Sequence, residues 1–321
     1  MSNFFQLLIN EQLKLYIRKS TWVMYILVSV IILGLAFLVN FTQSIDAPGS
    51  NEKYQDNNWK QTLQQENEDL KKEMEKEEMM QGFNTRQIEK NNYYLENDIQ
   101  PSSYDAWQFV MENEFLLYLV SLFTIIVAAG IIANEFKWGT IKLLLIRPIT
   151  RTKILLSKYV SVLLFALFTL LYVLVFSWVV GILFFGINGM DPHIVINQSE
   201  GYAYVSVIQQ ILEGYGFQLV MLVMMATFAF MISAIFRQSS LAIGIAIFLM
   251  LAGNAIVGFF ADYSWAKFIL FANTDLSQYA NGATALEGMS LGFSITVLVV
   301  YYVIFLVLSW VFFTKRDVAG Q

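Results

Sequence analysis

Residues 159–187 read YVSVLLFALFTLLYVLVFSWVVGILFFGI, a run of 29 residues with no Asp, Glu, Lys, Arg or His. A helix of roughly 20 apolar residues crosses the hydrocarbon core of a bilayer. A helix that is hydrophobic all round has no polar face to present to water. The run therefore predicts a transmembrane helix, and the class of the whole fold follows from it.

Five more stretches share these properties, and all six together predict an all-α integral membrane protein with six transmembrane helices. The composition agrees, because 57% of the 321 residues are hydrophobic and 14% are charged, whereas soluble domains carry about 25% charged residues. The first stretch is too long and starts too late for a signal peptide, so it predicts an uncleaved anchor. The five stretches are residues 22–41, 115–133, 217–236, 241–261 and 291–314.

Lysine and arginine predict the orientation, because loops on the cytoplasmic side carry an excess of them. With the N-terminus inside, the inner segments hold 12 basic residues and three acidic ones, Glu11, Glu135 and Asp317. The two short outer loops then hold one basic residue, Lys267, and the reversed topology would break the rule. The sequence thus predicts cytoplasmic N- and C-termini.

Two segments flank the first predicted span. Residues 1–21 have an apolar helical face and predict an amphipathic helix in the inner membrane interface; a plain extension of the span is the alternative. Residues 42–114, with 16 acidic and seven basic residues, show apolar residues at helical spacing on both sides of Gly82. They predict a helical extracytoplasmic hairpin, rigid or mobile, that receives or gates a substrate or serves as a solvated spacer. The apolar face of the first segment consists of Phe5, Leu8, Ile9, Leu13 and Tyr16.

Residues 134–158, NEFKWGTIKLLLIRPITRTKILLSK, form a basic loop on the predicted inner side. Aromatic and aliphatic residues alternate there with Lys137 and Lys142, which predicts a short helix at the inner membrane surface. Pro148 is expected to end this helix, because proline lacks the backbone donor and crowds the preceding turn.

The remaining connections are expected to lie outside or at the C-terminus. Residues 188–216 are expected to form an outer loop, and residues 315–321 a cytoplasmic tail. Residues 262–290 are too apolar for a solvated loop and too short to span. They predict an outer loop with a re-entrant or interface-lying segment, provided that protein buries its free backbone groups.

Small residues recur four apart in three of the predicted spans, and this spacing favours close helix packing. The pairs are Ala129 and Ala133, Ala229 and Ser233, and Ala242 and Ala246.

Motifs for catalysis and nucleotide binding are absent from the sequence. It has no Cys and one His, His193, and it contains no G-x-x-x-x-G-K-[ST], no H-E-x-x-H and no G-x-S-x-G. His193 is expected to be a solvated turn residue and not a metal ligand. None of the six spans holds an ionisable residue that could bind a coupling ion or relay protons. A transport function would thus draw its energy from another subunit, and the apolar spans favour an amphipathic or hydrophobic substrate.

The loop at residues 134–158 resembles the corresponding loop of ABC transporter permeases of the ABC-2 type. The resemblance rests on Glu135-Phe-Lys-Trp-Gly139-Thr140, Leu143-Leu-Leu, Arg147-Pro148, Thr150-Arg151 and Lys158, and on the C-terminal Phe313-Thr-Lys-Arg-Asp317. The layout of six spans, inner termini and a large first outer loop extends it over the whole chain.

The resemblance implies a permease subunit of a bacterial exporter in the plasma membrane. Such a permease has no ATPase activity and no cofactor of its own; two separate ABC ATPase subunits bind ATP and Mg and dock on the loop, which acts as a coupling helix. A second copy of the permease or a paralogue, and membrane lipid, are the other implied partners, and nucleic acid is not one. The ATPase-coupling residues would be Glu135, Gly139, Thr140, Arg147, Pro148, Arg151 and Lys158.

Within this resemblance, Glu135 and Arg151 would contact the ATPase or the N-terminal helix, Gly139 would permit close approach, and Pro148 would set the bend into the third span. The substrate is undefined, with faces of the second and fifth spans as the expected contact surfaces. Two other functions fit the sequence: a receptor or immunity protein that binds a ligand through residues 42–114, and an ion-coupled carrier.

Overall fold

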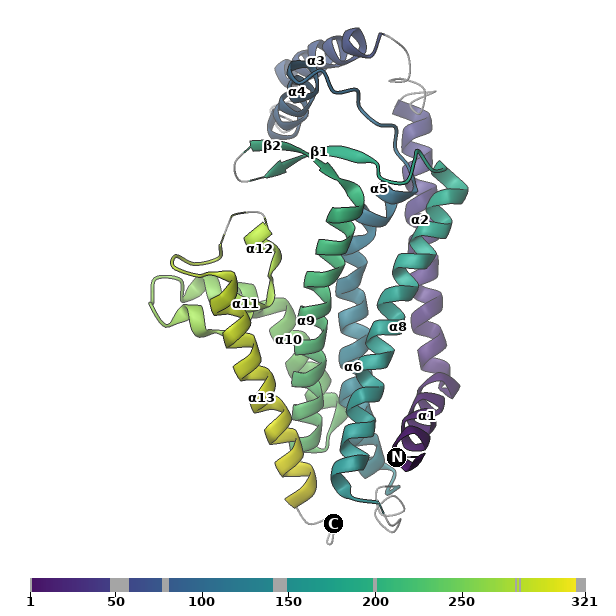
Figure 1. The fold of residues 1–321 in the computed structure, drawn as a ribbon, viewed down its shortest axis with the longest axis vertical. Coiled ribbons are helices and arrows are strands. Elements are labelled where there is room, and N and C mark those ends of the chain that lie inside the picture. Colours follow the sequence, from purple (N-terminus) through teal and green to yellow (C-terminus); the bar gives the residue numbers. More distant parts are fainter. Residues whose placement is uncertain are drawn as a thin grey trace. The chain divides into compact units, whose positions relative to one another are not determined.

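A computed structural model describes residues 2–46, 58–76, 81–140, 149–198, 201–280, 282 and 284–315, and most of these residues are helical (Figure 1). The chain divides into two compact units. Unit one comprises Met1–Val28, Phe115–Val173 and Gly214–Gln321, and unit two comprises Ser29–Glu114 and Leu174–Glu213.

Six helices of the described chain are long and apolar enough to cross a membrane. Each predicted stretch lies largely in one of them, and the chain is a multi-pass helical membrane protein. Most of these helices extend past the charged residues at which the apolar runs end, because a helical backbone bonds itself whatever side chain it carries. The six are α2 (Lys19–Asp46), α6 (Leu117–Lys137), α8 (Arg151–Phe185), α9 (Val207–Phe236), α10 (Ser239–Phe259) and α13 (Leu291–Lys315).

The N-terminal segment forms a helix of its own, α1 (Ser2–Ile17), which meets α2 at Arg18 (Figure 1). The last carbonyls of a helix have no partner within it. Here the Thr21 hydroxyl donates to the Leu15 carbonyl (2.6 Å), and the Trp22 indole donates to the Tyr16 carbonyl (2.9 Å). These bonds stabilise a junction between two helices, and not the plain extension of the span that was the alternative.

Unit one is built around α6, on which α10 packs. The Ser233 hydroxyl of α9 donates to the Ala129 carbonyl of α6 (2.6 Å) and accepts from the Ala133 amide (3.2 Å). Ala242 and Ala246 of α10 are fully buried. The small-residue spacing thus predicted close helix contact correctly, and the structure adds two hydrogen bonds between α6 and α9.

Short helices fill the segment between α10 and α13: η3 (Ala266–Phe268), α11 (Leu270–Thr274) and α12 (Ser277–Ala280). Every residue of α11 is buried. The Asn273 amide donates to the carbonyls of Lys267 and Ile269 (both 2.9 Å), and its oxygen accepts from the Ser294 hydroxyl (2.7 Å). Protein thus buries α11 and satisfies Asn273, as a re-entrant or interface-lying segment requires, whereas Trp265 and Phe268 before α11 are exposed.

Unit two contains the helices α3 (Trp59–Lys76) and α4 (Gln81–Glu96), which pack side by side (Figure 1). Between them the Asn67 amide donates to Asn92, and the Asn91 amide donates to Asn67 (both 2.9 Å). Leu63 and Tyr94 form a small apolar core beside these amides. Asn67 thus takes part in a matched polar contact between α3 and α4.

Residues 188–216, expected to form an outer loop, contain regular secondary structure that the sequence did not predict. Strands β1 (His193–Gln198) and β2 (Gly201–Ser206) form an antiparallel hairpin, with Val195 opposite Tyr204, and α9 begins directly afterwards at Val207. The strands are rich in β-branched and aromatic residues, which fit a pleated, half-buried surface. They were missed because six-residue strands are too short to give a clear period. His193 is the first residue of β1, and its Nδ1 lies 3.0 Å from the Asp191 carbonyl.

Helix α5 (Ala106–Glu112) belongs to unit two and passes close to α8 at Gly181. The 3-10 turn η2 (Asn113–Leu116) connects α5 to α6. Asp105 caps α5, because its carboxylate accepts from the amides of Trp107 and Gln108 (3.0 and 3.1 Å). A Cβ at Gly181 would lie 2.9 Å from the Ala106 Cα, so only glycine allows α8 to pass this close.

Candidate functional site

The buried stripe of α1 carries a charged residue. Leu7, Glu11 and Leu15 lie four residues apart, and all three are buried. Residues at this spacing share one face of a helix. Phe5, Ile9 and Leu13, from the apolar face predicted for an interfacial helix, are exposed. Helix α1 therefore presents an apolar face outward and directs Glu11 into unit one.

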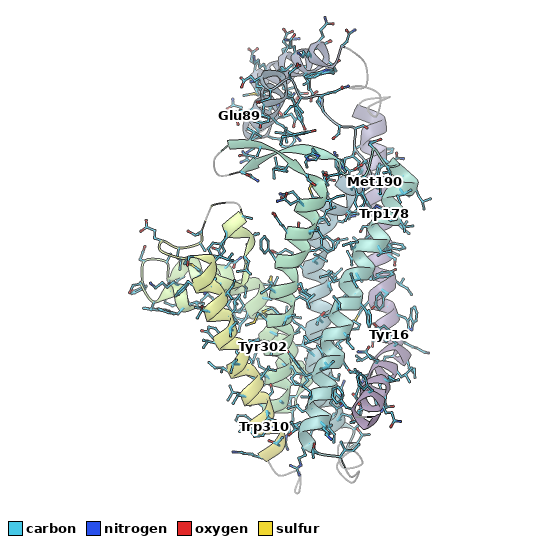
Figure 2. The ribbon with its side chains drawn as sticks, viewed as in Figure 1. Tyr16, Glu89, Trp178, Met190, Tyr302 and Trp310 are labelled. Atoms are coloured by element: carbon cyan, nitrogen blue, oxygen red, sulfur yellow. The ribbon has the colours of Figure 1, made fainter. Side chains whose placement is uncertain are left out.

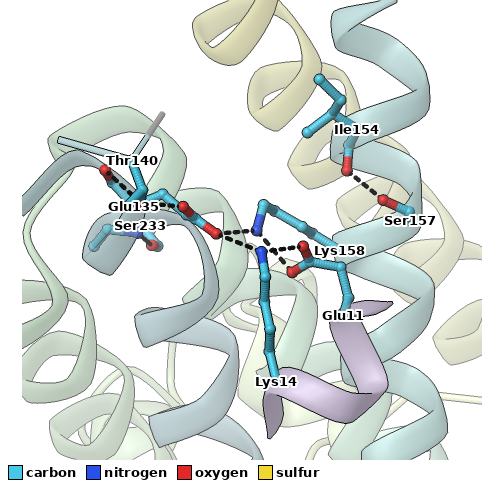
Figure 3. A network of polar contacts seen from close by, with 9 residues as sticks. Glu11, Lys14, Glu135, Thr140, Ile154, Ser157, Lys158 and Ser233 are labelled. Atoms are coloured by element: carbon cyan, nitrogen blue, oxygen red, sulfur yellow. Dashed lines mark hydrogen bonds and ion pairs between the residues drawn. The ribbon is translucent and has the colours of Figure 1, made fainter. Parts of the chain in front are cut away.

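Glu11 belongs to a group of four charged residues from three helices, here termed the charge cluster: Glu11 and Lys14 of α1, Glu135 of α6 and Lys158 of α8 (Figure 3). The Lys158 ammonium lies 2.7 Å from Glu11 Oε2 and 2.9 Å from Glu135 Oε1. The Lys14 ammonium lies 2.9 Å from Glu11 Oε1 and 3.2 Å from Glu135 Oε1. Each ammonium thus bridges both carboxylates, and α1 is bound to α6 and α8.

The charge cluster is buried and electrically balanced. The side chains of Lys158, Glu11 and Glu135 are 1%, 5% and 11% exposed, and that of Lys14 is 37% exposed. Two carboxylates facing two ammonium groups avoid the large cost of an unpaired buried charge. Partial burial lowers the pKa of Lys14, but the hydrogen bonds and charges of Glu11 and Glu135 outweigh it and raise that pKa above its usual value.

Thr140 completes the contacts of Glu135 just after the end of α6. Its hydroxyl donates to the Glu135 Oε2 (Figure 3). Gly139 before it has a φ of +69°, the left-handed conformation in which glycine commonly ends helices. Its amide donates to the Phe136 carbonyl (3.1 Å). No described atom lies within 4 Å of a Cβ placed on Gly139, so backbone conformation, and not close approach within this part of the chain, accounts for the glycine.

Aromatic residues near the end of α6 hold two cations from other elements. The Arg237 guanidinium, in the link between α9 and α10, lies 4.3 Å from the centre of the Phe136 ring. The Arg18 guanidinium, at the junction of α1 and α2, lies 5.6 Å from the centre of the Trp138 ring. Such cation–π contacts add to the ion pairs. The end of α6 thus contacts α1, α8 and the link between α9 and α10.

Arg151, the first residue of α8, is not part of the charge cluster. It donates to the Thr314 carbonyl near the end of α13 (3.0 Å), where a cation also favours the helix dipole. The Trp310 indole of α13 donates to the Thr152 hydroxyl nearby (3.0 Å; Trp310 is labelled in Figure 2). Of the predicted coupling residues, the structure therefore brings Glu135, Thr140 and Lys158 together and places Arg151 against α13.

Two predicted coupling residues, Arg147 and Pro148, lie outside the described residues, as does the predicted tail after Lys315. Two members of the charge cluster, Glu11 and Lys14, were not predicted as site residues. A signal for them exists in the sequence, because Glu11 is a lone acid in the basic N-terminal segment, at helical spacing from Leu7 and Leu15. In the described part of the chain, no group of three or more His, Asp or Glu side chains could hold a metal ion.

The two helices expected to contact substrate differ in how much surface they present. Fourteen of the 21 residues of α6 are buried. Helix α10 buries Ala242, Ala246, Gly253 and Val257, while Phe248 and Leu251 are exposed. Within unit one, α10 therefore has the larger free apolar face.

Comparisons with known proteins give a family and two relatives. The family model described as "Protein of unknown function (DUF2705)" matches residues 79–319. The chain is 43% identical over 326 residues to the uncharacterized protein YhcI of Bacillus subtilis (strain 168), covering 98% of this chain and 99% of that protein. It is 34% identical over 203 residues to the uncharacterized membrane protein YdbK of the same organism, covering 62% of this chain and 78% of that protein. The name of YdbK agrees with a membrane protein, and none of the three names specifies an activity.

Proposed function

The chain belongs to the DUF2705 family, and we propose that it is the permease subunit of an ATP-driven exporter of the ABC-2 type. The substrate would be an amphipathic or hydrophobic molecule such as a peptide, an antibiotic or a lipid-like compound. Two ABC ATPase subunits would bind ATP and Mg, and a second copy of the permease or a paralogue would complete the complex. The complex would lie in the bacterial plasma membrane.

The observation that carries this proposal is the charge cluster. An ATPase that moves the segment after α6 needs a rigid connection from that segment to the membrane helices. Glu135 and Thr140 at the end of α6 connect to Lys158 of α8 and to Glu11 and Lys14 of α1 through bonds of 2.7–3.2 Å and the Thr140 hydroxyl. A displacement of this segment would thus be passed to α1 and α8 together, since breaking a buried ion pair is costly.

The charge distribution supports the orientation that the proposal requires. With the N- and C-termini in the cytoplasm, the basic residues flanking the charge cluster face the side where ATP is hydrolysed. Residues 42–114 would then form an extracytoplasmic domain that includes the packed helices α3 and α4. The exposed apolar residues Phe5, Ile9 and Leu13 of α1 support its placement in the inner interface.

The sequence supports an external energy source. The six predicted apolar runs contain no Asp, Glu, Lys, Arg or His that could bind a coupling ion, and the chain has no phosphate-binding loop. A separate ATPase is the energy source that this combination favours over an ion gradient. For the same reason, the ion-coupled carrier is the weaker alternative.

The proposal is tested by isolating the intact complex from native membranes with a tag on this chain. We expect an ABC ATPase to co-purify, and reconstituted vesicles to move substrate only when ATP is supplied. Glu135→Gln should preserve the complex but lower the transport achieved per ATP hydrolysed, whereas Lys153→Gln, at an exposed position of α8, should not. Substrate movement by the purified chain alone, driven by an ion gradient, would refute the proposal.

A further inference from the structure

Unit two contains a cavity of about 520 Å³ that the proposed transport function does not use. Helix α4, helix α5 and strand β1 form its walls. Small-molecule sites commonly have volumes of roughly 300–1,000 Å³ and mostly apolar linings with a few polar groups. Phe83, Met111, Ile194 and Ile196 supply an apolar surface of this kind.

Hydrogen bonds between the walls hold the cavity in shape. The Val195 amide of β1 donates to the Tyr94 hydroxyl of α4 (3.1 Å). The Tyr202 hydroxyl of β2 donates to the Arg86 carbonyl of α4 (2.8 Å). The Ser102 hydroxyl, which precedes α5, donates to the His193 carbonyl (3.1 Å). A cavity whose walls are bonded to one another loses little entropy when a ligand binds.

Two cations of α4 line the cavity. Arg86 and Lys90 are four residues apart on α4, and neither makes an ion pair with another residue in the described ranges. Like charges at this spacing disfavour the helix. Glu112 also lines the cavity, but its Oε2 accepts from the Tyr104 hydroxyl (2.6 Å). Burial lowers the pKa of Lys90, and the more distant charges of Glu112 and Glu66 offset only part of that effect.

We propose that this cavity binds an amphipathic organic anion. Its carboxylate or phosphate group would accept hydrogen bonds from Lys90 and Arg86, and its apolar body would pack on Met111, Ile194 and Ile196. A charge-assisted bond to an anion would compensate the half-buried ammonium. The proposal rests on unit two alone, so it holds whether or not the chain transports a substrate.

The test is equilibrium binding of three small naphthalene compounds to the full chain in lipid nanodiscs. Empty nanodiscs measure how much of each compound partitions into lipid, and this amount is subtracted. We expect saturable binding of 1-naphthaleneacetate and 1-naphthyl phosphate, and the tighter of the two identifies the preferred anionic group. The uncharged 1-naphthaleneacetamide should bind about tenfold more weakly, since a hydrogen bond to a charged group is worth roughly 1.4 kcal/mol or more. Equal binding of the amide and the acid would overturn the proposal.

Variants locate the site. Lys90→Gln should weaken binding of both anions about tenfold, Lys90→Arg should retain it, and Lys71→Gln, which removes the same charge from an exposed position of α3, should leave it unchanged. Ile196→Trp narrows the cavity without changing charge and should abolish binding of all three compounds. Thermal unfolding checks that each variant is folded, and if Lys90→Gln is not, Arg86→Gln and Ile196→Trp carry the test. Unaltered anion binding in the folded variants would refute the site.

Discussion

Replacing Lys158 with methionine tests the central contact of unit one. The Lys158 ammonium is almost fully buried and bonds Glu11 and Glu135 at 2.7 and 2.9 Å. Methionine keeps most of the length and the apolar stem of lysine but removes the charge. The two carboxylates would then share the single ammonium of Lys14, which is already partly exposed.

Removal of one partner from a buried ion pair costs about 3–5 kcal/mol in the free energy of unfolding. Glu11 would keep Lys14 at 2.9 Å, and Glu135 would keep the Thr140 hydroxyl. We therefore expect the lower end of this range, about 3 kcal/mol. Adding Glu11→Gln to Lys158→Met leaves one carboxylate, Glu135, and one ammonium, Lys14, so the charges of the cluster balance again. The double variant should thus be more stable than the sum of the two single effects predicts, by roughly 1 kcal/mol or more.

The assay is denaturant unfolding of the purified chain in detergent, followed by tryptophan fluorescence, for the wild type, both single variants and the double variant. Lys153→Met is the matched control, because this lysine is on the same helix but exposed, and it should change stability by no more than about 0.5 kcal/mol. The reasoning is refuted if Lys158→Met costs no more than Lys153→Met, or if the effects of Glu11→Gln and Lys158→Met simply add.

Three further predictions concern backbone fit and charge. Gly253→Ala should destabilise the chain by about 1–3 kcal/mol, because its Cβ would lie 2.4 Å from the Phe271 ring; Gly244→Ala on the same helix meets open space and should be neutral or stabilising in the same unfolding assay. Gly139→Ala should cost about 1 kcal/mol because φ is +69°, whereas Gly139→Asn should cost less; equal costs would contradict the conformational explanation. Lys90 has a lowered pKa in the folded chain, so the free energy of unfolding should rise with pH between that pKa and the ordinary value of 10.5. Binding of 1-naphthaleneacetate should fall over the same pH range. Identical pH titrations of the wild type and Lys90→Gln would contradict both effects.

Much of the membrane fold could be predicted from sequence. Apolar runs as long as residues 159–187 have no stable place in water, and the charges between them limit where each helix leaves the bilayer. The hairpin at residues 193–206, within the outer loop expected at 188–216, could not be predicted, because two six-residue strands carry too few residues for a clear period and pair only when the chain turns back on itself. The small residues of α6, α9 and α10 could be predicted to pack because their spacing is local.

Some residues of the candidate site could likewise be predicted from the sequence, and others could not. Glu135, Thr140 and Lys158 were identified from a motif, and contact of Glu135 with the N-terminal helix was one of its two expected outcomes. The motif did not indicate which residues of that helix, Glu11 and Lys14, complete the cluster, because 121 residues separate Lys14 from Glu135. Arg151, grouped with Glu135 by the same motif, bonds α13 at the far end of the sequence. A motif records which residues occur near one another in the chain, whereas partners across helices depend on packing.

By itself, the sequence determined that this is a multi-pass helical membrane protein without a nucleotide-binding loop. Hydrophobic burial depends on composition over about 20 consecutive residues, and that is a local property. Only the tertiary structure decided that a charged residue of α1 is buried between α6 and α8, and that two cations of α4 line a cavity against β1. Ion pairs and cavity walls act over a few ångströms, so they exist only once distant segments have been brought together.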